Sequence, residues 1–437
     1  MGIQILVIAL IIMLIMTYLL FNRDILTPFF ITIGMFLVSS LVAWLNVDKW
    51  GFSLSYFTIL IMISMLMSFG AGAYFAKAVS RRIDVNKPQK TMERIEIYPL
   101  ITLVFIFVLL LFLAKACQII YAMSLQYGNT EGLMAMWSTA RSAVLDYGAN
   151  KSRLLNHMTA FAKAIGFIYC WLFLQNIVTK KLKKSDLLLG VPVILAILIQ
   201  ILGTLSRGFL IEWIAYIIML YFILYSKFHG WKKMNMTRLL IIGGSALALF
   251  FVFFAMLGIM GQRLGDRSIL DTIFFYTGMS IPSFDGFLTN YVSKTAAIGG
   301  ETLYGIHSVM QKLGFELPEQ SRHLEFISFN GTSGNVYTSL RRYINDYGIL
   351  GTYIIQFYLG AFYTFFYQCL KKHSNTFLML AYAILAHPLL MQGIDELFLS
   401  QYAAVGTVNL CIYMIFAYLT IYYFPEKVRI RRSAQKG

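Results

Sequence analysis

The sequence predicts an all-α integral membrane protein that crosses a bilayer about eleven times. Hydrophobic residues make up 59% of the 437 residues, charged residues make up only 13%, and the mean hydropathy is +0.69. The apolar residues also form long uninterrupted runs such as Gly2–Phe21. A helix needs about 20 apolar residues to cross a hydrocarbon core of ~30 Å. The short alternating segments of a membrane β-barrel are absent from the sequence.

The spans follow one another in order, and charged connectors or polar loops separate them. The first is interpreted as a retained span, because no basic residue precedes it and no small-x-small cleavage pattern follows Leu20. The predicted spans are 3–21, 25–46, 53–79, 98–124, 155–178, 187–205, 208–226, 239–260, 348–370, 376–398 and 402–424. Charged residues separate many of them: Arg23-Asp24, Asp48-Lys49, the basic segment 81–94, Lys180–Lys184, Lys227–Arg238 and Lys371-Lys372. Polar loops precede 155–178 and 348–370, and a tight turn precedes 208–226.

The distribution of charge predicts the orientation. When the spans alternate between two sides, the basic connectors and the C-terminal tail fall on one side, with 22 Lys/Arg and 6 Asp/Glu. The other side has 12 Lys/Arg and 13 Asp/Glu, and only Lys115, Lys163 and Glu212 lie within spans. Basic connectors favour the cytoplasmic side, so we expect the N-terminus outside and the C-terminus in the cytoplasm. Topology therefore accounts for the net charge of +16, and no nucleic-acid partner is expected.

We expect a single transmembrane domain over residues 1–437, with its chemistry at the outer face. Two outer loops are long, 125–156 and 261–347. The second is rich in Gly, Ser, Thr, aromatic and charged residues. It is expected to contain short helices and to carry part of the active site.

The tight outer turn Gly203–Gly208 places Arg207 at or just below the membrane surface. An arginine at bilayer depth costs about 2.5–3.5 kcal/mol on insertion scales, so another interaction has to offset that cost. Its planar guanidinium presents paired donors that suit the oxygens of a lipid diphosphate. Snorkelling toward water, or pairing with Glu212, is the alternative that involves no function.

A second candidate site leads into the ninth span, over Asn335–Gly348. If this segment is helical, Thr338, Arg342 and Asp346 line one face, and Arg341 lies beside it. Two arginines and a carboxylate would make an anion clamp in which Asp346 orients an arginine or acts as a base. The structural alternative is an amphipathic turn with an Arg342–Asp346 pair, which is worth roughly 0.2–0.5 kcal/mol.

Other polar groups of the outer side are candidates for substrate binding. Basic residues would hold phosphates and aromatic rings would stack on sugars. The adjacent carboxylates Asp395 and Glu396, with His387 one or two turns earlier, would suit acid–base chemistry. Each group is also compatible with a solvated loop or a structural hydrogen bond. The further candidates are Arg263, Arg267, Arg322, His323, Glu325, Asp285, Glu301, Tyr276, Phe284 and Tyr304.

Several motifs of soluble and nucleotide-dependent enzymes are missing from the sequence. It contains no P-loop, no Rossmann glycine fingerprint, no His-Glu-x-x-His and no Gly-x-Ser-x-Gly motif. No Asp-x-Asp pair is present to bind a metal with a sugar nucleotide, so neither a metal nor another cofactor is expected. The four cysteines all fall within predicted spans, which predicts no disulfide framework.

The second candidate site also carries a resemblance. Thr332–Thr338, then Arg341, then Asp346-Tyr347-Gly348-Ile349-Leu350-Gly351 resembles the signature of Wzy-type bacterial oligosaccharide repeat-unit polymerases, which make O-antigen and capsule. That signature reads Asn-Val-Tyr-Thr, an arginine, then Asp-aromatic-Gly-x-x-Gly. The turn Ser206-Arg207-Gly208, and Phe275-Tyr276 before Ser280-Ile281-Pro282, are similar to family features in the same order. The motifs cover residues 200–355.

The resemblance implies a polytopic glycosyltransferase with a GT-C-like architecture. Such an enzyme moves a growing glycan from undecaprenyl diphosphate onto another lipid-linked repeat unit, at the outer face of the bacterial cytoplasmic (inner) membrane. The product would be O-antigen, capsule or exopolysaccharide. The implied partners are the two lipid-linked oligosaccharides, membrane lipids, a chain-length regulator and a flippase.

Negative charge would accumulate on the departing diphosphate, and preorganised arginines would stabilise it without a metal. We expect Arg207 and Arg341 to bind the diphosphate, with Arg342 in support, and Asp346 to orient an arginine or act as the base. Glu325 and His323 are the other candidates for the base. The remaining substrate-binding residues are expected to be Asn335, Tyr337, Thr338, Arg263, Arg267 and Arg322.

Other functions stay open on the sequence alone. A ligase that passes a finished glycan to lipid A core would use the same architecture and leaving group. A flippase or exporter of lipid-linked sugar would need a charged central cavity, which three charged residues within the predicted spans hardly provide. An interaction or scaffold protein would not explain charged motifs concentrated at the outer side.

Overall fold

The chain is an all-α, polytopic membrane protein. The computed structural model describes residues 2–80, 92–96, 98–133, 135–206, 208–231, 268–291, 298–317, 324–373 and 375–427. Within these residues, nine helices are long and apolar enough to cross a membrane. They are Gly2–Leu20, Pro28–Leu45, Tyr56–Ser80, Pro99–Gln126, Arg153–Val178, Lys184–Thr204, Gly208–Phe228, Ser339–Lys372 and Val405–Lys427, and each corresponds to a predicted span.

Two of the eleven predicted spans do not match such a helix. The span 239–260 lies outside the described residues. The span 376–398 was predicted too long, since its helix ends at Met391 after 16 residues. A helix of this length extends only about 24 Å. The polar residues of Gln392–Glu396 follow it and form a turn whose groups contribute to the site below.

The chain divides into two compact units. The first, unit 1, comprises Met1–Lys90 and Arg267–Val405; the second, unit 2, comprises Thr91–Asp266 and Gly406–Gly437. Each unit has its own packed interior of helices. The single domain over the whole chain stays a prediction.

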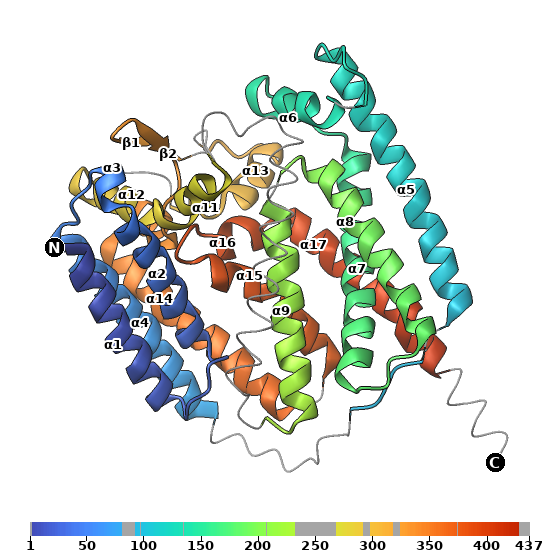
Figure 1. Ribbon diagram of the computed structural model, residues 1–437, viewed down its shortest axis with the longest axis horizontal. Coiled ribbons are helices and arrows are strands. Elements are labelled where there is room, and N and C mark those ends of the chain that lie inside the picture. Colours follow the sequence, from blue (N-terminus) through green and yellow to red (C-terminus); the bar gives the residue numbers. More distant parts are fainter. Residues whose placement is uncertain are drawn as a thin grey trace. The chain divides into compact units, whose positions relative to one another are not determined.

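The described part of unit 1 contains seven helices of the N- and C-terminal parts and the short elements of the loop 261–347. The expected short helices of that loop are present, together with a hairpin that the sequence analysis did not predict. Figure 1 shows α1, α2 and α4 side by side. The elements are α1 (Gly2–Leu20), α2 (Pro28–Leu45), α3 (Val47–Trp50), α4 (Tyr56–Ser80), α11 (Ile269–Gly278), α12 (Ser280–Thr289), α13 (Tyr304–Lys312), β1 (Ile327–Phe329), antiparallel to β2 (Thr332–Gly334), α14 (Ser339–Lys372), α15 (Thr376–Met391) and α16 (Phe398–Tyr402).

The helices α4 and α14 form the most intimate contact of unit 1. A Cβ atom at Gly72 would collide with the carbonyl oxygen of Phe357, and one at Gly360 would collide with that of Phe69. Two glycines, one on each helix, therefore let the backbones approach closely, as small residues do in membrane helix pairs. Near this crossing, the Ser68 hydroxyl donates to a backbone carbonyl of α14 at 2.8 Å.

Connectors that were predicted to share a side lie together in unit 1. Lys371, in the last turn of α14, binds the Asp24 carboxylate between α1 and α2. At the other ends of these helices, Lys49 of α3 binds Asp271 of α11 at 2.6 Å. Both contacts join segments that were predicted to lie on the same side of the membrane.

The described part of unit 2 is a bundle of long helices, with the short helix α6 in the loop 125–156. The helix α7 packs against α8 and α9, and α5 packs against α8 (Figure 1). Its elements are α5 (Pro99–Gln126), α6 (Met136–Asp146), α7 (Arg153–Val178), the 3₁₀ turn Lys184–Leu189, α8 (Gly190–Thr204), α9 (Gly208–Phe228), α17 (Val405–Tyr418) and the π-helical turn Leu419–Tyr423.

An ion pair is buried between two spans of unit 2. Lys163 of α7 donates to Glu212 of α9 at 2.5 Å, with their side chains 13% and 5% exposed. A charge at this depth needs a partner, and each residue supplies it to the other. Glu212, the structural alternative considered for Arg207, is thus bound to Lys163, and Arg207 itself lies outside the described residues.

Candidate functional site

A kink sets apart the first nine residues of α14 from the rest of that helix. Gly348 has φ 69° and ψ 178°, a conformation essentially reserved for glycine, and it interrupts the helix that begins at Ser339. The predicted span 348–370 therefore begins at the kink. The segment Ser339–Tyr347 carries Arg341, Arg342 and Asp346, and all three side chains are buried.

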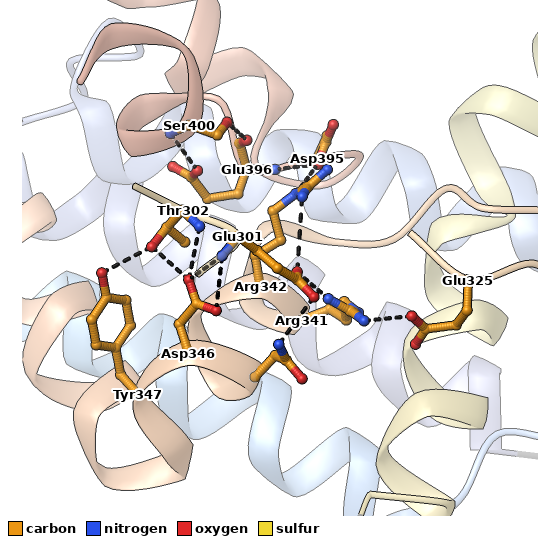
Figure 2. A network of polar contacts seen from close by, with 11 residues as sticks. Glu301, Thr302, Glu325, Arg341, Arg342, Asp346, Tyr347, Asp395, Glu396 and Ser400 are labelled. Atoms are coloured by element: carbon orange, nitrogen blue, oxygen red, sulfur yellow. Dashed lines mark hydrogen bonds and ion pairs between the residues drawn. The ribbon is translucent and has the colours of Figure 1, made fainter. Parts of the chain in front are cut away.

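Arg341 joins two distant segments of unit 1. Its Nη1 atom donates to Glu301, and its Nη2 donates to Glu325 Oε2 at 2.6 Å (Figure 2). The guanidinium also lies 4.9 Å from the ring centre of Phe287 and 5.4 Å from that of Tyr337. The Arg341 side chain is only 3% exposed, so its charge is balanced by two carboxylates and two aromatic faces in a largely dry environment.

Arg342 connects the same segment to the turn after α15. Its Nε donates to Asp395 Oδ1 at 3.0 Å, and its Nη1 lies 3.8 Å from a Glu301 carboxylate oxygen. The sequence allowed an i, i+4 ion pair between Arg342 and Asp346, whereas these two contacts of Arg342 are with residues distant in the sequence. Arg342 instead binds across the tertiary fold.

Asp346 holds the chain segment that precedes α13. Its carboxylate accepts hydrogen bonds from the Glu301 backbone N–H at 3.1 Å, and from the backbone N–H and the hydroxyl of Thr302 at 2.7 Å each. The Thr302 hydroxyl also contacts the Tyr347 hydroxyl at 2.8 Å. Since both Asp346 oxygens accept from this segment, the carboxylate fixes the backbone that carries Glu301.

Glu396 is the most deeply buried carboxylate of the network. It is 1% exposed and accepts from the Tyr343 hydroxyl at 2.8 Å and from the backbone N–H groups of Leu399 and Ser400. Burial raises the pKa of the Glu396 carboxyl above its ordinary value, although these hydrogen bonds act in the opposite direction. The Asp395 carboxylate beside it accepts from the Glu396 backbone N–H.

The network contains more acid than base. Among the described residues, the network contains the two arginines of α14 and five carboxylates, those of Glu301, Glu325, Asp346, Asp395 and Glu396 (Figure 2). Burial raises the pKa of the Glu301 carboxyl, against the lowering effect of Arg341. Glu325 differs from the others because its side chain is 52% exposed while Arg341 holds one of its oxygens. It is thus an accessible carboxylate in a fixed position.

Several of the sequence-predicted site residues come together here. Arg341, Arg342, Asp346 and Glu325 belong to the network, and the Tyr337 hydroxyl donates to the Glu325 carbonyl at 3.0 Å. Thr338 is the buried N-cap residue of α14 rather than part of a helical face, and Asn335 is half-buried in the preceding segment. The candidates that lie outside the described residues are Arg207, Arg263, Arg267, Arg322 and His323.

The sequence alone does not connect these arginines with their partners. Glu301, Asp395 and Glu396 were candidates only as separate outer groups. In the fold they lie beside Arg341 or its neighbours, although Glu301 is 40 residues from Arg341 and Asp395 is 53 residues from Arg342. Thr302 was not singled out at all. No local pattern in the sequence encodes such pairs, since tertiary packing creates them.

Within the part of the chain that the structure describes, no group of three or more His, Cys, Asp or Glu side chains is arranged to hold a metal ion. The carboxylates of the network instead have arginine and N–H partners. Searches among protein families, among curated proteins and among solved structures find no match to this chain.

Proposed function

We propose that this chain is a glycosyltransferase that polymerises lipid-linked oligosaccharide repeat units. It would transfer a growing glycan from undecaprenyl diphosphate to another lipid-linked repeat unit at the outer face of the bacterial cytoplasmic membrane. One observation carries the proposal: the block by which the sequence resembles the polymerases, Asn335–Gly351, contains both arginines and Asp346 of the buried network.

The proposed reaction needs one proton acceptor and one stabilised leaving group. An acceptor hydroxyl oxygen attacks the anomeric carbon of the donor, and the bond from that carbon to the diphosphate oxygen breaks. Undecaprenyl diphosphate leaves with the bonding electrons, and the hydroxyl proton passes to a carboxylate. Glu325 suits this role because it is half-exposed and Arg341 holds it in place. It is preferred over Asp346, whose oxygens are occupied by the Glu301–Thr302 segment.

The arginines of α14 would act through charge. In the proposal, Arg341 fixes the Glu325 base and adds positive potential near the leaving diphosphate, with Arg342 in support. Asp346 is a positioning residue, because it binds the backbone that presents Glu301 to both arginines. Arg207, from the Ser-Arg-Gly turn, keeps its proposed role on the diphosphate.

Purified protein and purified lipid-linked repeat units test the proposal directly. Wild type is expected to give a ladder of products; a single transfer would indicate a ligase, and transport without a new glycosidic bond would indicate a flippase. Either result would overturn the proposed polymerase activity.

Glu325→Gln tests the base. It is expected to lower the rate by roughly 10²-fold or more, as the loss of a general base does. Glu316→Gln is the matched control, since this carboxylate lies exposed in the same loop, and should leave the rate unchanged. Arg207→Ala should abolish polymer in a protein that still inserts normally. A full rate in Glu325→Gln would remove this residue from the mechanism.

A further inference from the structure

The hairpin β1–β2 begins two residues after Glu325 and is closed by a two-residue turn. Its strands are antiparallel, and Ser328 lies opposite Ser333. The turn residues Asn330 and Gly331 have φ 43° and 73°. Positive φ at both positions is what a type I′ turn requires, and Asn-Gly is a preferred pair for it. The turn therefore fixes the register of the two strands and with it the face on which each side chain lies.

One face of the hairpin packs against helices of unit 1. Ile327 and Phe329 of β1 both approach Gly286 of α12, where a Cβ atom would lie 3.2 Å and 3.8 Å from their side chains. In β2, a Cβ atom at Gly334 would collide with the ring of Phe275 in α11. These contacts occupy one of the two faces of the hairpin and hold it in place.

The opposite face is exposed and combines one aromatic ring with polar groups. Side chains alternate between the two faces of a strand, so Ser328 and Ser333 lie away from the packed face, and both are exposed. Phe326 precedes β1 and Asn335 follows β2, and the same alternation places them beside the two serines. Phe326 is 68% exposed and Asn335 is half-buried. These four residues are called the hairpin face below.

An exposed ring beside hydroxyl and amide groups suits a carbohydrate. The C–H groups on one side of a pyranose form an apolar surface that can pack on a flat aromatic ring such as that of Phe326. The hydroxyls at the edge of the sugar can exchange hydrogen bonds with serine hydroxyls and an asparagine amide, since these groups both donate and accept. None of the four side chains is charged, which favours a neutral glycan over an anionic lipid head group.

The position of Phe326 indicates which glycan the hairpin face would bind. Glu325 is the proposed base, so the acceptor hydroxyl has to reach its carboxylate. The Tyr337 hydroxyl holds the Glu325 carbonyl at 3.0 Å, and the Cα atom of Phe326 follows that of Glu325 by about 3.8 Å. The Phe326 ring is exposed, whereas Arg341, which binds Glu325, is 3% exposed. The ring therefore lies outside the buried network, where it can contact a sugar next to the reacting one.

We propose that the hairpin face is a subsite for the acceptor glycan and holds a sugar beyond the one that carries the attacking hydroxyl. The sugar packs on Phe326, and Ser328, Ser333 and Asn335 bind its hydroxyls. The subsite rests on the proposed function for the identity of its ligand, and it adds residues of a hairpin to the site. It makes recognition depend on the length of the glycan, because a single sugar at Glu325 does not reach Phe326.

Binding measurements test the subsite apart from catalysis. The probes are the lipid-linked repeat unit, undecaprenyl diphosphate that carries a single sugar, and undecaprenyl diphosphate without a glycan, each titrated into the purified full-length protein in detergent. Phe326→Ala is expected to weaken binding of the repeat unit about three- to tenfold, the size of an aromatic contact, and to leave the other two affinities unchanged. Phe326→Trp should bind as well as wild type. Phe315→Ala is the matched control, because Phe315 is an exposed ring of the same loop outside the hairpin.

The outcomes separate the subsite from the polymerase activity. Wild-type affinity of Phe326→Ala for the repeat unit overturns the subsite, even if the protein makes polymer. An equal loss for the probes with one sugar or none also overturns it, because the ring would then contact lipid, as aromatic residues at a membrane interface do. Ser333→Ala should weaken repeat-unit binding about two- to tenfold, and it keeps the test decisive if Phe326→Ala does not fold. A loss confined to the repeat unit, in a protein that makes no polymer, would support the subsite and refute only the polymerase proposal.

Discussion

Replacing Arg341 by methionine would expose the energetic role of the charged network. Methionine keeps an unbranched apolar side chain but removes the guanidinium that binds Glu301 and Glu325. The Arg341 side chain is 3% exposed, that of Glu301 is 14% exposed, and that of Glu325 is 52% exposed. The two ion pairs should therefore contribute unequally to stability.

The magnitude follows from this difference in exposure. Removing one partner of a buried ion pair costs roughly 3–5 kcal/mol, because a carboxylate stays buried without its compensating charge. A pair with a half-exposed partner is worth only about 0–1 kcal/mol. Arg341→Met should thus lower the free energy of unfolding by roughly 3–5 kcal/mol, whereas Glu325→Gln should lower it by less than about 1 kcal/mol. In Arg341→Met/Glu301→Gln the uncompensated charge is gone, and most of the loss should be recovered.

Denaturant unfolding of the detergent-solubilised protein, followed by tryptophan fluorescence, measures these differences. Lys49→Met is the matched control, because Lys49 binds Asp271 in an exposed ion pair and its loss should change the unfolding midpoint very little. The reasoning would be refuted if Arg341→Met were as stable as wild type. It would also be refuted if the double variant were no more stable than Arg341→Met.

Two further predictions concern the kink and the buried acid. Gly348→Ala should lower the free energy of unfolding by roughly 1–3 kcal/mol, since its φ of 69° disfavours any side chain while the space around a Cβ is open; Gly34→Ala, at an open position within a helix, should be neutral or stabilising by the same fluorescence measurement. For Glu396, burial raises the pKa in the folded protein, so the protonated form is favoured there. The stability that this gives is fully present below the unfolded pKa of about 4.3 and is lost as the pH rises through the folded pKa. Glu396→Gln should therefore match wild type in acid and become relatively more stable as the pH rises in thermal unfolding curves; a difference that did not depend on pH would contradict this assignment.

The helices were predictable because long apolar runs leave the chain few alternatives in a bilayer. Hydropathy predicted the end of a span less well where the apolar run is followed by polar residues. The turn Gln392–Glu396 was included in a span, although its carboxylates bind Arg342 and Tyr343. Hydropathy was uninformative for α6, since its 11 residues are only weakly apolar and its Trp137 contacts a distant helix.

The candidate site was predictable only in part. Arg341 and Arg342 stood out because two charges precede an apolar run, and this signal is local. Their partners Glu301 and Asp395 are distant in the sequence. They reach the arginines only because the loop 261–347 and the turn after α15 fold against α14. The helical face expected from Thr338 also failed, since this residue has an extended conformation with ψ 159° and precedes the helix.

The glycines that bring α4 and α14 together also determine which parts of unit 1 can adapt to a substrate. Where α4 and α14 cross at these glycines, no side chains separate the two backbones. The helices therefore have no layer of side chains between them that could rearrange and let one helix slide along the other. The C-terminal end of the segment Ser339–Tyr347 is therefore attached to a rigid pair of helices. Adjustment to glycans of different shape would fall to the loop residues of the network, where Glu325 precedes a three-residue hairpin strand and Glu301 lies within a turn.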